Sequence, residues 1–268
     1  MADQSCLTVS LFVMALTCFM ASVGRRVAVR RTRSRPLVRG LLLEAIATAE
    51  LCACCFELII VADNFGVAAY AAVLFALTVW WSNEWGEATA CPYTHLEDVL
   101  DGKTDVRVAA LKIWAQLTGG VLIFRYIQVI WWLELCDTHK NRAFEQCTAD
   151  LQVPVLLGAA IEGVATALCR IASRAIADIE PKFASIIESF IGTSLVVAAF
   201  HFSGGYFNPA LATALKLGCK GHTAYEHLIV YWAGACAGAV VGTLLYKHPF
   251  IKERILGPER AARLKKAL

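Results

Sequence analysis

Charged residues are scarce in this chain of 268 residues. Asp, Glu, Lys and Arg make up 18% of it and hydrophobic residues 58%, with a mean hydropathy of +0.57. Soluble domains carry about 25% charged residues, so this composition excludes a soluble enzyme as the starting hypothesis. The formal net charge of +3 is too small to indicate nucleic-acid binding. The sequence also lacks a nucleophile–base pair, a cofactor motif and any Cys/His spacing that fits a tetrahedral metal site. We therefore expect no enzyme, no cofactor and no metal.

Long apolar segments are what the chain has in abundance. Each comes close to the roughly 20 residues that a transmembrane helix needs, and in lipid such a segment satisfies its backbone groups as a helix. We predict an all-α polytopic membrane protein. The predicted spans are Leu7–Val23, Gly40–Val61, Gly66–Ser82, Val108–Leu133, Leu151–Cys169, Phe183–Phe202 and Leu228–Tyr246.

Basic residues determine the predicted topology. Seven arginines follow the first span, between Arg25 and Arg39, and seven basic residues follow the last one. If the N-terminus is outside, 20 basic residues fall on the cytoplasmic side and four on the other. This bias matches the positive-inside rule, so the first segment is predicted to be an uncleaved anchor and the C-terminus to be cytoplasmic.

An internal repeat divides the segments after this anchor. Glu44-Ala-Ile-Ala-Thr48 is echoed by Glu162-Gly-Val-Ala-Thr166 at an offset of 118 residues. The other matches are Trp114-Ala115 with Trp232-Ala233 and Gly120 with Gly238, at 118, and Cys91-Pro92 with Asn208-Pro209, at 117. Each copy contains three spans, so the second copy enters the membrane inverted. Inverted repeats are typical of transport proteins with a pathway at the repeat interface.

The echoed glutamates are expected to be structural. A carboxylate inside a membrane is costly unless it is paired or faces protein. We therefore place Glu44 and Glu162 against the loops of their own repeats, where they accept backbone N–H bonds. Glu50, Glu57 and Glu188 are interpreted as bundle-facing or end-of-span residues.

Two prolines mark the starts of predicted half-helices. In Asn208-Pro209-Ala210, Asn is a preferred N-cap and Pro a preferred first helical residue. The Asn208 side-chain amide can then donate a hydrogen bond toward a neutral polar molecule, next to the positive end of the half-helix. The matching segment, Cys91-Pro92-Tyr93, has a thiol where the amide would stand. Cysteine is a poor cap and a weak donor.

With these motifs, the chain from about Pro36 to Tyr246 resembles an aquaporin. The resemblance is carried by the two Glu-x-x-x-Thr motifs, the Ala115-Gln116-Leu-Thr-Gly119 segment, the Asn208-Pro209-Ala210 box and the inverted repeat. The degenerate first box, the additional hydrophobic N-terminus and Cys219 resemble the unorthodox subfamily, the superaquaporins, which contains aquaporins eleven and twelve. The Cys-Pro-Tyr form of the first box is similar to the arthropod type.

The resemblance implies an aquaporin-like right-handed bundle of six transmembrane helices and two re-entrant half-helices, plus the extra N-terminal helix. It also implies a homotetramer in the lipid bilayer with one pore in each subunit. Asn208 would be the central donor, Pro209 and Ala210 would stack against Pro92, and Cys91 and Tyr93 would replace the missing polar half. The family's narrow filter would fall on about Ala71, Val196, Gly205 and Leu211. Orthodox members have an arginine at the position of Leu211, so a wider and more hydrophobic filter is expected.

Three cysteines are predicted to face the oxidising side: Cys136, Cys147 and Cys219. We predict a disulfide between Cys147 and Cys219, with Cys136 unpaired or an alternative partner. Arg125 is the one arginine within a predicted span. The simpler interpretation is that its side chain snorkels to the membrane surface or pairs with an acidic neighbour. The more specific hypothesis is that it partly substitutes for the missing filter arginine.

We predict three regions: an N-terminal anchor with an Arg-rich cytoplasmic segment (1–35), a channel domain (36–246, with repeats at about 36–134 and 151–246) and a basic cytoplasmic tail (247–268). Lys265 and Lys266 resemble a dilysine retrieval signal, which favours the endoplasmic reticulum membrane. The predicted function is passive passage of water and small neutral solutes such as glycerol or hydrogen peroxide. The alternatives are a non-conducting membrane scaffold, with Tyr93 plugging the path, and an ion-coupled secondary transporter.

Overall fold

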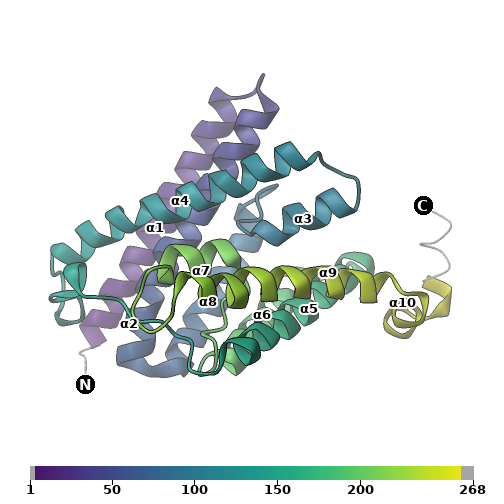
Figure 1. Ribbon diagram of the computed structural model, residues 1–268. Coiled ribbons are helices and arrows are strands. Elements are labelled where there is room, and N and C mark those ends of the chain that lie inside the picture. The colour runs from purple at the N-terminus through teal and green to yellow at the C-terminus, as the bar shows by residue number, and fades with distance from the viewer. Residues whose placement is uncertain (1–3, 261–268) are drawn as a thin grey trace.

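The computed structural model describes residues 4–260, which fold into helices joined by loops, with no strand among them. This confirms the all-α prediction. Figure 1 shows the start of α1 and the loop after α4 at one end of the bundle and α10 at the other. In chain order the elements are α1 (Gln4–Arg31), α2 (Pro36–Glu84), α3 (Pro92–Leu100), α4 (Val106–Trp132), η1 (Asp137–His139), η2 (Arg142–Phe144), α5 (Val155–Ile179), α6 (Ala184–Ala199), α7 (Pro209–Lys216), α8 (Ala224–His227), η3 (Leu228–Gly234), α9 (Ala235–Lys247) and α10 (Pro249–Leu256).

Each predicted span corresponds to a helix or to one arm of a helix. The described helices long and apolar enough to cross a membrane are α1, α2, α4, α5 and the continuous segment Ala224–Lys247, and α6 is a shorter apolar helix. The long α2 supplies two spans because its backbone reverses at Gly66, where φ is 84° and ψ 168°. Side chains exclude that conformation for other residues, so residues 36–65 and 67–84 form a hairpin.

Two spans extend well beyond their predicted C-terminal ends. The fifth span begins at Val155 and continues to Ile179, ten residues beyond the predicted Cys169. The first continues to Arg31 instead of ending at Val23. The extension of α5 carries Asp178, which pairs with Lys252 of α10, and the extension of α1 carries Arg25, which pairs with Glu50 of α2. These polar contacts support helix beyond the apolar runs from which the prediction was made.

Close helix crossings occur at equivalent places in the two repeats. A side chain on Gly119 of α4 would place its Cβ 2.1 Å from the Ala45 carbonyl oxygen in α2, and one on Gly238 of α9 would lie 2.1 Å from the Gly163 oxygen in α5. Ala45 and Gly163 are 118 positions apart, but Gly119 and Gly238 are 119 apart. The predicted match of Gly120 with Gly238 is therefore wrong by one residue. The π-helix η3 supplies the extra residue, as π-bulges do.

Helix α1 packs against the bundle through buried polar side chains as well as apolar ones. Arg25 is only 5% exposed and forms an ion pair with Glu50, which is also buried. The indole N–H groups of Trp80 and Trp85 donate to the same carboxylate, at 3.3 and 3.0 Å. Arg25 was counted among the arginines of the predicted cytoplasmic segment, and the structure places it on α1 with its side chain buried against α2.

A second buried carboxylate, Glu57, holds the opposite end of α1. It accepts hydrogen bonds from the Ser10 hydroxyl at 2.7 Å and the Trp131 indole at 2.9 Å, and His139 lies 2.8 Å away. Ser10 belongs to α1, Trp131 to α4 and His139 to the loop after α4. Glu50 and Glu57 therefore face the bundle, and together they fasten α1 to it at two levels.

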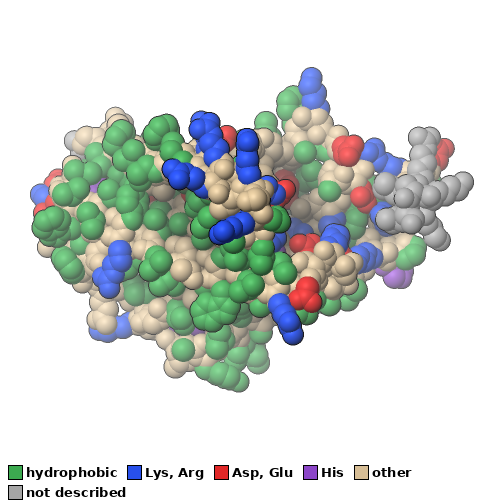
Figure 2. Space-filling view, turned by 90° about the horizontal axis from the view of Figure 1, so that it is seen from above, with side chains coloured by type: hydrophobic (Ala, Val, Ile, Leu, Met, Phe, Trp, Pro, Cys, Tyr) green, Lys and Arg blue, Asp and Glu red, His purple; other side chains and the backbone are tan. Residues whose placement is uncertain are grey.

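The segment after α9 is partly docked on the bundle. Helix α10 begins at Pro249, and its Lys252 forms an ion pair with Asp178 of α5 at 3.0 Å. Figure 2 shows Lys and Arg side chains gathered on the face seen from above, between broad hydrophobic flanks. Lys265 and Lys266, on which the retrieval signal depends, lie outside the described residues.

Candidate functional site

Glu44, on the first arm of α2, organises the loop that leads into α3. Its carboxylate accepts the backbone N–H of Thr89 at 3.2 Å and that of Ala90 at 3.0 Å. The Gln116 amide of α4 donates to it at 2.8 Å, and the His95 ring lies 3.1 Å away. Glu44 is 1% exposed, so this carboxylate holds the loop and does not reach open space.

Glu162, on α5, has the same arrangement in the second repeat. It accepts the backbone N–H groups of Tyr206 at 3.2 Å and Phe207 at 2.7 Å, and the Ser203 hydroxyl at 2.6 Å. The Tyr231 hydroxyl then donates to the Ser203 carbonyl at 2.7 Å. Each repeat thus uses one buried carboxylate to fix the loop before its half-helix.

The carboxylates stabilise an unfavourable backbone conformation. Ala90 and Phe207 have φ angles of 51° and 46°, in the left-handed region that residues with side chains seldom adopt. Such residues persist where surrounding contacts over-determine them. Each of these two residues donates its N–H to the carboxylate of its own repeat. The next residues, Cys91 and Asn208, have an extended backbone and are the N-cap residues of the two half-helices.

The half-helices begin at the two prolines. Helix α3 starts at Pro92, and Cys91 makes no side-chain capping bond. Helix α7 starts at Pro209, and the Asn208 side-chain oxygen accepts the N–H groups of Ala210 at 3.0 Å and Leu211 at 3.3 Å.

Asn208 also joins the two repeats. Its amide nitrogen donates to the Ala90 carbonyl of the first loop at 2.7 Å. A side-chain amide has two N–H groups, so one remains to face the space in front of α7. The two loops therefore meet at Asn208, which is the residue expected to act as the central donor.

A cavity of about 820 Å³ runs beside this meeting point. Its wall includes Cys91, Tyr93 and Asn208. Along α6 it extends from Glu188 to Val196, a rise of about 12 Å at 1.5 Å per residue, and it continues to His201 just after the helix. Arg170 and Ser173 line one end, and Asp150 and Gln152 line the other. One elongated cavity thus connects the two ends of α5 and passes both half-helix starts.

Three of the four expected filter residues line this cavity: Val196, Gly205 and Leu211. The fourth, Ala71, is not part of the wall, and Tyr70 takes its place. Consecutive residues of a helix point about 100° apart. An error of one position in the predicted filter therefore names a residue that faces away from the cavity. Tyr70 packs on Phe200, with ring centroids 5.0 Å apart. The aromatic character of Tyr70 was the one signal in the sequence that could have identified it.

Thr89 and Thr94 were also missed by the sequence analysis. The Thr94 hydroxyl donates to the Cys91 carbonyl and lies 2.7 Å from the Thr89 hydroxyl. Thr89 lines the cavity. These hydroxyls supply polar groups in the half whose box lacks an asparagine.

Arg125 does not contribute to the cavity. It is exposed on α4 and donates to Gln128 at 2.8 Å, and it is not among the residues that line the wall. The hypothesis that it substitutes for a filter arginine is therefore wrong. The arginine that does line the wall is Arg170 on α5, which makes two hydrogen bonds to Glu97 of α3, at 2.9 and 2.7 Å. Its guanidinium carbon lies 5.8 Å from the centroid of the Tyr93 ring.

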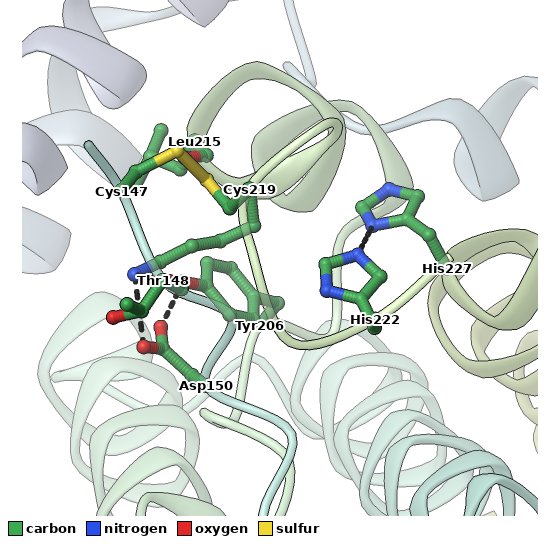
Figure 3. The surroundings of a disulfide bond; sticks show 9 residues. Cys147, Thr148, Asp150, Tyr206, Leu215, Cys219, His222 and His227 are labelled. Atoms are coloured by element: carbon green, nitrogen blue, oxygen red, sulfur yellow. Dashed lines mark hydrogen bonds and ion pairs between the residues drawn. A yellow bond between two sulfur atoms is a disulfide. The ribbon is translucent and has the colours of Figure 1, made fainter. Parts of the chain in front are cut away.

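Cys147 and Cys219 form a disulfide at the opposite end of the cavity (Figure 3). It joins the loop after α4 to the loop after α7. Beneath it, Lys216 forms an ion pair with Asp150 at 2.8 Å, and the Tyr206 hydroxyl donates to the same carboxylate at 2.5 Å. Asp150 lines the cavity, so the disulfide and these polar contacts hold the wall of this end in place.

A histidine pair next to the disulfide is expected to make stability depend on pH. Burial lowers the pKa of His222, and its Nε2 lies 3.1 Å from His227 Nδ1. Because the unfolded histidine has a pKa of about 6.5, the unfolded state binds more protons as pH falls below that value, and stability decreases. We expect a lower melting temperature at pH 5.0 than at pH 7.5, with a smaller decrease in His222→Gln. Equal decreases in the two proteins would contradict this assignment.

Comparisons with known proteins agree with this geometry. The family model of the major intrinsic proteins matches residues 155–263. Aquaporin-11 of Milnesium tardigradum is 28% identical over 241 residues, which cover 88% of this chain and 84% of that protein. Aquaporin-12 of Mus musculus is 26% identical over 254 residues, covering 90% and 86%. The X-ray structure of the aquaglyceroporin from Plasmodium falciparum superimposes with a TM-score of 0.60 at 12% identity, covering 81% of this chain and 99% of that one.

The fold and the paired half-helices define a multi-pass membrane protein with the aquaporin fold. The second half of the chain matches the family model of the major intrinsic proteins, and over most of its length the chain is similar to aquaporins eleven and twelve, the unorthodox subfamily.

Proposed function

We propose that the protein is a passive membrane channel for water and small neutral solutes, with glycerol and hydrogen peroxide among them. The observation that carries this proposal is the cavity of about 820 Å³, which passes the Asn208 amide and both half-helix starts. An uncharged donor at the positive ends of helix dipoles favours neutral polar molecules and disfavours cations.

The wall near the expected filter supports solutes larger than water. Val196 and Leu211 are apolar. Neither side chain adds a charge to the cavity, and neither fills as much of it as an arginine would. The same wall includes Asn208 and Tyr70, whose side chains carry uncharged polar groups. Glycerol has both polar and apolar faces, so it fits a wall of this mixed character.

Assembly and location belong to the same proposal. We expect a homotetramer in the bilayer, and the exposed apolar residues Leu122, Leu156 and Phe190 give the helices surfaces that suit lipid or other subunits. We place the protein in the endoplasmic reticulum membrane with a cytoplasmic C-terminus, on the strength of the basic-residue asymmetry and the Lys265-Lys266 tail.

Stopped-flow light scattering of proteoliposomes tests the proposal. Under gradients of sucrose, glycerol and hydrogen peroxide, we expect water efflux in the first case and solute entry in the others, without a requirement for an ion gradient. Flux that depends on an ion gradient would indicate a secondary transporter, and the absence of flux a scaffold.

A matched pair of variants locates the pathway. Val196→Trp fills the cavity wall on α6, whereas Val241→Trp adds the same bulk on the exposed surface of α9. We expect Val196→Trp to reduce water and glycerol flux to near the level of empty liposomes and Val241→Trp to conduct like the wild type. Equal conduction by both variants would show that solutes pass elsewhere.

A further inference from the structure

We propose that Cys6 and Cys136 are the two halves of a second disulfide, which links helix α1 covalently to the loop after α4. Both cysteines have free thiols in the structure. The two side chains interact, and the Cys6 side chain also interacts with the backbone of Asp137 and Thr138. The two thiols are therefore neighbours although they are 130 positions apart in the chain.

The contacts around this cysteine pair hold it in place. One turn after Cys6, Ser10 donates to Glu57, and Glu57 in turn bonds His139, three residues after Cys136. Ser10, Glu57 and His139 are all fully buried. The two segments that carry the thiols are thus packed together through Glu57, so the proposed bond would join parts of the chain that are already neighbours.

The Cys147–Cys219 disulfide identifies the compartment. Cys136 and Cys147 lie on one loop, between the end of α4 and the start of α5, and no span separates them. Cys6 interacts with that loop, and Figure 1 places the start of α1 at the same end of the bundle. Disulfides form and persist in oxidising compartments. Whichever side of the membrane holds the bond between Cys147 and Cys219, the Cys6 and Cys136 thiols face the same side.

The reaction is a thiol–disulfide exchange with an oxidised dithiol carrier of that compartment. The thiolate of Cys136, the more exposed of the two, attacks one sulfur of the carrier disulfide and forms a mixed disulfide. The Cys6 thiolate then attacks the Cys136 sulfur and releases the carrier as a dithiol. The two protons lost by the cysteines are taken up by the carrier, which is reduced by two electrons.

Burial slows the first step at neutral pH. It raises the pKa of the Cys136 thiol above the usual cysteine value, and the thiolate is the reacting species. Oxidation of the pair in vitro is therefore expected to accelerate as pH rises through 8 to 9. The carrier must also reach the loop, on which Cys136 is partly exposed.

The test uses the full-length protein in membranes, with free thiols blocked by N-ethylmaleimide before solubilisation. Trypsin places Cys6 in residues 1–25 and Cys136 in residues 126–140. We expect a linked peptide pair that is lost on reduction, next to the pair that contains Cys147 and Cys219. Cys18→Ser, on the same helix, is the matched control and should retain the link, whereas Cys6→Ser should abolish it and leave Cys136 alkylated.

A second measurement does not depend on recovering apolar peptides. A protease site inserted between Arg33 and Ser34 allows α1 to be cut from the rest of the chain. After cleavage and denaturation in SDS, the α1 fragment should stay attached without reductant and separate with it. If membranes treated with oxidised glutathione keep the bond between Cys147 and Cys219 while Cys6 and Cys136 are both alkylated and the fragment separates, the proposal is wrong. Flux measurements are independent of this outcome.

Discussion

Glu50→Leu is expected to lower the free energy of unfolding by about 3–5 kcal/mol, the range for removing one partner of a buried ion pair. The substitution leaves the buried Arg25 guanidinium with only Glu84, at 3.8 Å, as an ionic partner, and leaves the indole N–H groups of Trp80 and Trp85 without their acceptor. The double variant Arg25→Leu/Glu50→Leu should recover most of the loss, because replacing both members of a buried pair by apolar residues is often neutral.

Unfolding of the purified protein in mixed micelles with increasing SDS, followed by tryptophan fluorescence, measures these differences. Arg26→Leu is the matched control, since Arg26 is the exposed neighbour of Arg25 on α1. It should unfold like the wild type. If the double variant is as unstable as Glu50→Leu, apolar packing around the site and not the unpaired charge determines stability.

Leu211→Arg is expected to convert the broad filter into a selective one. Leu211 lies in the first turn of α7 and lines the cavity with Val196, Gly205 and Tyr70. An arginine there would add a fixed positive charge and fill part of the space. We expect glycerol flux to fall at least about tenfold, equivalent to about 1.4 kcal/mol in the barrier, while water flux falls much less.

The ratio of glycerol to water flux in proteoliposomes is the relevant measurement, because it is independent of the amount of protein inserted. Leu211→Met, which adds length without charge, is the control and should leave the ratio close to that of the wild type. A glycerol-to-water ratio in Leu211→Arg equal to that of Leu211→Met would mean that Leu211 does not face the narrow part of the path.

The elements that the sequence predicted well are those with strong local rules. Pro92 and Pro209 begin helices because proline suits the first helical position, and both half-helices start there. The apolar runs predicted the spans, and the Glu44 and Glu162 motifs indicated which repeat loops the carboxylates would contact. These features depend on short segments whose chemistry is visible in the sequence.

The features that sequence reasoning missed depend on the rotation of one helix relative to another. Tyr70 and Ala71 are adjacent, and only packing determines which of them faces the cavity. The pairing of Arg25 with Glu50 required knowing that α1 lies against α2, although the two residues are 25 positions apart and on different spans. The extra residue of η3 shifted the register of the last helix, because a π-turn has no sequence signature of its own.

The hydrogen bond from Asn208 to Ala90 constrains the order of assembly during synthesis. Its partners are 118 residues apart, so at a translation rate of about 5–20 residues per second the Ala90 carbonyl waits about 6–24 s for its donor. During that interval the first repeat can hold its own loop through Glu44, but nothing from the second repeat shields it from lipid. The nascent chain must therefore remain beside the insertion machinery until α7 arrives, and variants that delay the second repeat should be degraded before they mature.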